Sequence, residues 1–207
     1  MRSKKELEVE LSRLALFENP SLGLEQYPIS SSIAAEWIWN MALRGEAANR
    51  IILDAACGTG IIGIGLLLMG AKKVFFLDKD PAAIITARKN YDQIKSDYEI
   101  KEAEFIISDI SLFDDNVDIV VQNPPFGTKT GHADKKFLEK AFSCAEIIYS
   151  MHKYSTKNFV ETIVKDFGFK ITHLWRFEFP IKHSFKFHTK PVNLVDVGLW
   201  RIEKIPG

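Results

Sequence analysis

The stretch that decides the fold is Ile51-Ile-Leu-Asp-Ala-Ala-Cys-Gly-Thr-Gly60. Its apolar start ends in Asp54 and predicts a buried strand that leads into a glycine-rich loop. A helix over residues 61–69 and a second strand over residues 73–77 follow, and Asp78 ends that strand. This order is typical of a doubly wound α/β domain with a mostly parallel sheet. Glycines let the backbone approach a ligand, and the helix N-terminus behind them favours an anionic group.

A second strand end carries candidate chemistry. The run Asp118-Ile-Val-Val-Gln-Asn-Pro-Pro-Phe126 is β-branched and then stops at two prolines. The prolines hold Asn123 extended and remove an N–H, so the carbonyl oxygens of Asn123 and Pro124 stay available to a ligand. Two such acceptors beside the ring of Phe126 suit the exocyclic amino group of a base, which can stack on that ring. The alternative is a turn that merely ends a strand.

Two cofactors fit the glycine loop. Gly58, Gly60 and Gly63 have the Gly-x-Gly-x-x-Gly spacing, and Asp78 follows about 20 residues later, as in NAD-binding proteins. Asp54, the Asn-Pro-Pro-Phe strand end and the short remaining chain favour S-adenosylmethionine instead. Asp54 would hold its ammonium group, and Asp78 would accept from both ribose hydroxyls.

Length and composition are those of an ordinary globular chain. The 207 residues are 46% hydrophobic and 26% charged, which predicts one sizeable core and a single domain over residues 1–207. Lys+Arg and Asp+Glu number 27 each, so any RNA contact must use a local patch or a partner.

Cysteine use and the chain start bear on location. Cys57 and Cys144 lie far apart, which speaks against a disulfide framework or a metal site. No signal-peptide core and no membrane-length apolar run is evident, so we expect no membrane association. A reducing compartment follows, the cytoplasm or alternatively the nucleus.

Three stretches carry a family resemblance. Asn123-Pro-Pro-Phe126 resembles the catalytic motif of class I S-adenosylmethionine-dependent amino-methyltransferases. The longer run 123–129, with Tyr149-Ser-Met-His-Lys-Tyr-Ser-Thr156 and Leu24-Glu-Gln-Tyr-Pro28, is similar to the small methyltransferase-like family that modifies adenine N6 in small-subunit ribosomal RNA. The resemblance covers nearly the whole chain. It implies a Rossmann-like, mostly parallel seven-stranded sheet with a C-terminal antiparallel hairpin.

The strand ends, the glycine loop and the resemblance together give three groups of candidate site residues. The catalytic group is Asn123, Pro124, Pro125 and Phe126. The cofactor group is Gln26, Tyr27, Asp54, Ala56, Gly58, Thr59, Gly60, Ile61, Asp78, Asp109, Ile110 and Asn123. The substrate RNA group is Lys129, His152, Lys153, Lys186, Phe187 and His188.

Several of these residues have an alternative role. Asp109 follows a strand at residues 103–108 and either accepts from the cofactor's adenine amino group or caps a helix, while Ile110 would pack on the adenine ring. In the family the segment of Gln26 and Tyr27 lies over the cofactor, but a loop tyrosine can also pack on the core. His152 and Lys153 match the family's His-Lys, although a histidine at a strand end can be structural.

The basic candidates are equally open. Residues 181–190 interleave Lys and His with Phe, which suits a groove for single-stranded RNA or forms a solvated loop. Lys129 would meet a phosphate or is an ordinary surface lysine.

The N-terminal residues 1–45 form a predicted helical segment over the cofactor site. We expect an amphipathic helix over residues 4–17 and a second helix from Ser30 to about Leu43. This chain has Ile29 where the family has threonine and Ala56 where the family usually has glycine. Further on, we expect a helix from Pro81 to about Asn90, a charged connection over residues 92–102, and solvated carboxylates at residues 80, 114 and 115.

The resemblance also implies an activity and a partner. The activity is methyl transfer to adenosine N6 in small-subunit ribosomal RNA. The alternatives are guanine N2, DNA adenine or protein glutamine as the methylated group, an NAD-dependent oxidoreductase, and an inert scaffold. Eukaryotic relatives act with a small zinc-ribbon activator, and a partner strand could cover Phe105-Ile-Ile107 at a predicted sheet edge.

Overall fold

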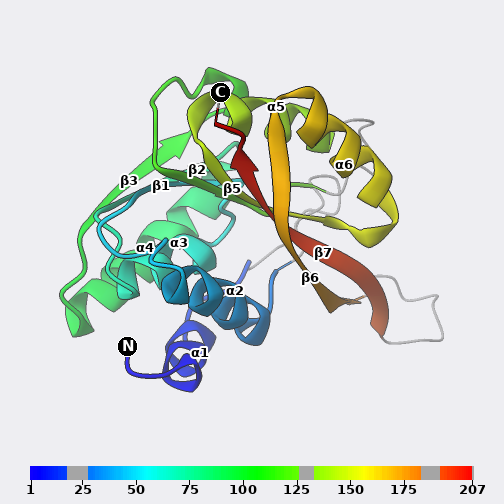
Figure 1. Ribbon diagram of the computed structural model, residues 1–207. Helices are drawn as coiled ribbons and strands as arrows, with labels where there is room; N and C mark the ends of the chain where they lie inside the picture. The colour runs from blue at the N-terminus through cyan, green and yellow to red at the C-terminus, as the bar shows by residue number, and fades with distance from the viewer. Residues whose placement is uncertain (18–27, 126–132, 183–191, 207) are drawn as a thin grey trace.

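One seven-stranded sheet organises the chain, as the computed structural model shows for residues 1–17, 28–125, 133–182 and 192–206 (Figure 1). Its strand order is β3-β2-β1-β4-β5-β7-β6. β1 to β5 are parallel, and β7 runs antiparallel to both of its neighbours. The strands are β1 (Ile51–Ala55), β2 (Lys73–Asp78), β3 (Glu102–Ile107), β4 (Ile119–Gln122), β5 (Ile147–Lys153), β6 (Phe169–Lys182) and β7 (Val192–Lys204). The predicted Rossmann-like sheet with its C-terminal antiparallel hairpin is confirmed.

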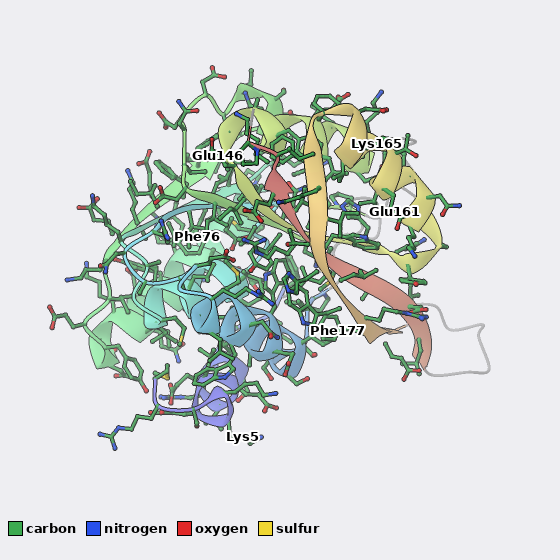
Figure 2. The ribbon with its side chains drawn as sticks, in the orientation of Figure 1. Lys5, Phe76, Glu146, Glu161, Lys165 and Phe177 are labelled. Atoms are coloured by element: carbon green, nitrogen blue, oxygen red, sulfur yellow. The ribbon has the colours of Figure 1, made fainter. Side chains whose placement is uncertain are left out.

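Helices cover both faces of the sheet and bury two apolar layers. The larger layer lies under α1 (Lys4–Ser12), α2 (Ser31–Leu43), α3 (Ile61–Leu68) and α4 (Pro81–Asp97). The other layer lies under α5 (Ala133–Cys144) and α6 (Lys157–Asp166), and the short 3-10 helices are η2 (Ile110–Leu112) and η3 (Tyr154–Thr156). Figure 2 shows Phe76 inside the molecule, whereas Lys5, Glu161 and Lys165 lie at its periphery. No helix among the described residues has the length and apolar character that crossing a membrane requires.

Two predicted boundaries were wrong. The first helix ends at Ser12 rather than near residue 17. The helix after β2 runs to Asp97, because its buried positions continue with helical spacing through Tyr91 to Ile94, so most of the expected connection over residues 92–102 is helical. Asp80, predicted to be solvated, caps this helix by accepting from the Ala82 N–H at 2.9 Å.

A buried ionic cluster ties the turn after α2 to the antiparallel strands. Arg201 of β7 donates from Nε to Glu46 at 3.1 Å and from Nη1 to Glu203 at 3.0 Å. Tyr149 of β5 donates its hydroxyl to the same Glu46. Burial pushes the pKa of Glu46 up, but the hydrogen bonds from Arg201 and Tyr149 outweigh burial, so its pKa lies below the ordinary value. The cluster is therefore a charged pair that needs both partners.

Glycines let α3 lie directly on its neighbours. A Cβ at Gly63 would lie 2.4 Å from the Phe76 ring and 2.9 Å from Asp54 Oδ2, and a Cβ at Gly65 would lie 2.3 Å from Ile38 Cδ1. An aromatic ring held between strand and helix cannot yield, whereas the terminal methyl group of Ile38 can rotate away.

We therefore expect Gly63→Ala to lower the free energy of unfolding by about 1–3 kcal/mol through overpacking. Gly65→Ala is the matched control, because it adds the same methyl group to the same helix against a movable neighbour. Chemical denaturation of both variants measures the difference. Equal losses, or a gain at Gly63 from the higher helix propensity of alanine, would contradict the packing argument.

Candidate active site

A pocket opens where the carboxyl ends of β1, β2 and β4 meet. Because parallel strands end at one edge of a sheet, residues far apart in sequence converge there. The residues that line it are Phe17, Pro28, Ile29, Asp54, Ala56, Cys57, Gly58, Thr59, Ile61, Ile62, Leu77, Asp78, Lys79, Ser108, Asp109, Ile110, Asn123, Pro124, Pro125 and Phe137. Most of the described candidates for cofactor and catalytic residues are thus brought together.

The glycine loop forms the floor of the pocket. Its turn is fixed by the Cys57 N–H, which donates to Leu77 O at 3.0 Å, and by the Gly60 N–H, which donates to Cys57 O at 2.9 Å. Gly58 and Gly60 have φ of 55° and 83°, and Ala56 has a left-handed φ of 55° despite its Cβ. That conformation costs a non-glycine residue about 1–2 kcal/mol, which explains why glycine suits this position.

Gly60 plays a different part from the one predicted. It precedes α3 and does not line the pocket. A Cβ there would lie 3.1 Å from the Cβ of Ala87, so Gly60 lets the loop pass close to α4.

Two buried carboxylates line the pocket. Asp54 is 3% exposed, and its Oδ2 accepts from the Gly63 N–H at 2.9 Å. Asp78 accepts from the Gly58 N–H at 2.9 Å and from the Asp80 N–H at 3.0 Å. Burial raises the pKa of Asp54 to about 7, with a smaller contribution from the charge of Asp78, and burial also raises the pKa of Asp78. No ion pair reaches either acid within the described residues, so the pocket suits a cationic, hydroxyl-bearing ligand.

Asp109 fills both of its predicted roles in geometry. It lines the pocket and also caps η2, where its Oδ1 accepts from the Ser111 N–H at 2.9 Å and from the Ser111 hydroxyl at 2.7 Å. Lys136 of α5 forms an ion pair with the same oxygen at 2.7 Å. The bond from Lys136, followed by those from Ser111, lowers the pKa of Asp109 to about 2. Ile110, buried beside it, completes an apolar wall.

Asn123 presents an unpaired acceptor. Its Oδ1 is buried and has no hydrogen-bond partner among the described residues, and Asn123, Pro124 and Pro125 all line the pocket. An unpaired buried carbonyl costs about 1–3 kcal/mol, so a bound donor would recover free energy at this atom.

The structure corrects the placement of His152. It is 2% exposed, lies edge-on to Trp200 and hydrogen-bonds Ser150 through Nε2 at 2.6 Å, while Gln122 donates to Ser150 at 2.9 Å. Burial lowers the pKa of His152 to about 3, so the ring is neutral near pH 7. A surface contact of His152 with RNA does not fit this burial, and its structural alternative does. Lys153, the last residue of β5, is partly exposed.

Some predicted residues lie outside the described part of the chain, and their roles stay predictions. They are Gln26, Tyr27, Phe126, Lys129, Lys186, Phe187 and His188.

Other pocket residues were not anticipated. Phe17 comes from the chain after α1, Phe137 comes from α5, and Ile29 supplies an apolar contact where the family has a hydroxyl. Phe137 and Leu138 of α5 are apolar among charged neighbours, but that pattern indicates only a buried face. Nothing in the sequence around Phe17 indicates a ligand contact.

Together, the sheet order and a pocket of glycine loop, buried acids and Asn-Pro-Pro strand end define a class I methyltransferase. The methyltransferase small domain model matches residues 39–148. An uncharacterised protein of Methanocaldococcus jannaschii is 36% identical over 99% of this chain and 96% of its own. The Drosophila melanogaster rRNA N(6)-adenosine-methyltransferase Mettl5 is 30% identical over 96% of this chain and 95% of its own.

A solved structure agrees with these relatives. The crystal structure of a candidate RNA methyltransferase from Pyrococcus horikoshii has a TM-score of 0.89, 35% identity and complete coverage of both chains. The chain belongs to the methyltransferase small domain family. It is an enzyme, its cofactor is S-adenosylmethionine, and the NAD alternative is set aside.

The residues present fit this cofactor. Asp54 is a buried acid with no cation partner in the described chain and would face the ammonium group. Asp78 has one lone pair free on each oxygen for the two ribose hydroxyls, since each oxygen accepts a single backbone N–H. The carboxylate of the cofactor would lie toward the N-terminus of α3.

The raised pKa of Asp54 predicts pH-dependent cofactor binding. A cationic ammonium favours the ionised carboxylate, so the Kd for S-adenosylhomocysteine should fall as pH rises through about 7 and then level off. Below that pH, the Kd should rise about tenfold per unit. Calorimetry between about pH 5.5 and 8.5 in two buffers measures both the Kd and the protons released.

Asp54→Asn is the matched control for this experiment. It should bind S-adenosylhomocysteine weakly and without pH dependence in the same range. A wild-type Kd that stays flat across pH 7 would contradict the role of Asp54.

Proposed function

We propose that this enzyme methylates the exocyclic N6 of an adenosine in RNA, and that the RNA is small-subunit ribosomal RNA. The observation that carries the proposal is the unpaired, buried Oδ1 of Asn123 at the edge of the cofactor pocket. An amino group on a base is the donor that this acceptor suits. The relatives named as rRNA N(6)-adenosine methyltransferases support the choice of adenine and of ribosomal RNA.

The chemistry requires an amino nitrogen that can act as a nucleophile. Its lone pair is delocalised into the base, and two acceptors on its hydrogens favour a more pyramidal nitrogen. Asn123 Oδ1 and the carbonyl of Pro124 supply these acceptors on a proline-stiffened strand end. When bound, S-adenosylmethionine supplies a methyl group activated by its positively charged sulfur.

Positioning accounts for most of the rate in this proposal. Holding the nitrogen in line with the methyl group at about 3–3.5 Å removes the entropic part of the barrier. No strong base is needed, because the nitrogen becomes acidic only after it has gained the methyl group. The buried, neutral His152 fits this view, since its Nε2 is already bonded to Ser150.

The target base must leave its stack to reach the pocket. Phe126 would stack on the flipped base, which is worth about 1–3 kcal/mol for an aromatic platform. Pro125, beside it in sequence, lines the pocket and would keep that ring near the acceptors.

The antiparallel hairpin offers a place for RNA. β5 pairs with β7 only as far as Lys153 and Val197, whereas β6 and β7 stay paired beyond that point to Lys182 and Val192. The hairpin therefore extends past the strand ends at which the pocket lies (Figure 1). The basic and aromatic residues Lys186, Phe187 and His188 follow β6 in sequence, so RNA contact there agrees with the neutral net charge of the chain.

Asn123→Ala tests the catalytic role. Losing one of two acceptors should lower methyl transfer by about 100-fold or more, because the amino group is no longer held in line. Cofactor affinity should stay within about twofold of wild type. Transfer of labelled methyl groups to RNA and calorimetry with S-adenosylhomocysteine measure the two quantities separately.

Asn40→Ala is the control, since Asn40 makes its hydrogen bonds within α2 to Glu36 and lies outside the pocket lining. An Asn123→Ala enzyme that loses turnover and cofactor binding equally would contradict the assigned role.

A partner strand on β3 is the second part of the proposal. β3 is an edge of the sheet, and Ile107 at its end is 55% exposed. Phe105, by contrast, stacks on Phe76 with ring centroids 4.8 Å apart and lies under Arg88, so a charge there would disturb the core. An exposed edge with apolar side chains suits strand addition by a small zinc-ribbon subunit.

Ile107→Asp should therefore weaken association with that subunit by about tenfold or more, through loss of a buried apolar contact. Leu112→Asp, at a residue 71% exposed that lies outside the strand, is the control and should bind normally. Calorimetric titration with the purified zinc-ribbon subunit measures both, and equal binding by the Ile107→Asp variant and wild type would overturn the proposed interface.

A further inference from the structure

Asn90 links three parts of the molecule through one side chain. It belongs to α4 and is 1% exposed. Its Oδ1 accepts from the Ala15 N–H at 2.8 Å, and its Nδ2 donates to Ala15 O at 2.9 Å and to Thr59 O at 2.9 Å. Both amide hydrogens are therefore used, one on the chain after α1 and the other on the glycine loop.

The linked segment reaches the cofactor pocket two residues later. Phe17 lines the pocket and lies directly over the glycine loop, since a Cβ on Gly58 would come within 2.9 Å of its Cζ. The Phe17 ring is thus a wall of the pocket, supported by a backbone position that must be glycine.

Little else holds this segment in place. α1 itself is anchored by Leu7 and Leu11 in the core. Past Leu14, the hydrogen bonds of the described chain to residues 15–17 are those that Asn90 makes with Ala15. The pairing copies that between two peptide groups, with a donor and an acceptor on each side, so it fixes direction as well as distance.

We propose that Asn90 is a positioning residue for cofactor binding, which holds the Ala15 peptide against the Thr59 carbonyl so that Phe17 walls the pocket. The inference concerns cofactor affinity alone. It does not depend on which nucleotide or RNA the enzyme methylates.

Asn90→Leu tests the proposal with little change in volume, because it removes all three hydrogen bonds. The Kd for S-adenosylhomocysteine should rise about tenfold, as for the loss of one aromatic contact. Asn90→Asp, which keeps the acceptor but loses both donors beside two carbonyl oxygens, should bind as weakly or more weakly.

Tyr91→Phe is the matched control for stability. Tyr91 is the next residue of α4, and it donates its hydroxyl to Lys101 O at 3.2 Å, away from the pocket. This variant loses a side-chain-to-backbone hydrogen bond of the same helix, and it should keep the wild-type Kd whatever its melting temperature.

A double-mutant cycle separates positioning from general destabilisation. If Asn90 acts through Phe17, then Phe17→Ala should also raise the Kd about tenfold, and the double variant Phe17→Ala/Asn90→Leu should bind about as weakly as either single variant. Additive effects, with a Kd raised about 100-fold in the double variant, would show that Asn90 acts by another route and would overturn the proposal.

The remaining outcome is also decisive. Calorimetry is run well below the melting temperature of each variant, so that all of them are folded. An Asn90→Leu protein that melts earlier yet binds S-adenosylhomocysteine with the wild-type Kd would reduce Asn90 to a stabilising residue. Loss of RNA methylation with an unchanged Kd would bear on the proposed function and not on this inference.

Discussion

Everything at the site depends on the parallel pairing of β1 with β4. Their register sets Ala55 opposite Gln122, so the glycine loop and the Asn-Pro-Pro strand end leave the sheet side by side. β1 is also the strand where the chain order reverses, with β2 on one side and β4 on the other. Such switch points open a crevice at the carboxyl ends of the strands. A cofactor on one strand end and a nucleophile on the next can therefore meet without any catalytic residue having to move.

The free energy of the apo pocket is spent on groups that wait for ligands. Asp54 and Asp78 are buried acids whose pKa values are raised by burial, and Asn123 Oδ1 is an unpaired acceptor. Each of these would be satisfied by a different part of the cofactor or of the target base. Ligand binding should therefore stabilise the fold as well as supply the chemistry.

Elements with a regular sequence pattern were predictable, and contacts between distant segments were not. The strands and the glycine loop follow from short apolar runs that end in Asp, Gly or Pro. The length of α4 was underestimated because polar residues past Asn90 hid the buried positions Tyr91 and Ile94. A strand end can be open or covered, so burial of His152 under Trp200 could not be read from its neighbours.

The site shows the same division. Asp54, Asp78, Asp109 and Asn123 were predictable because each follows a strand. Lys136 pairs with Asp109 only because η2 lies against α5, and Phe17 reaches Gly58 only because Asn90 binds a segment 75 residues away. Contacts of this kind depend on how helices cover the sheet.

The most direct test of the central claim is to identify the methylated product. Purified enzyme is incubated with methyl-labelled S-adenosylmethionine and total cellular RNA, DNA and protein in separate reactions, and labelled products are resolved as nucleosides or amino acids. The account predicts label in N6-methyladenosine, within the small-subunit ribosomal RNA fraction. Label in N2-methylguanosine, in DNA or in protein glutamine would contradict it.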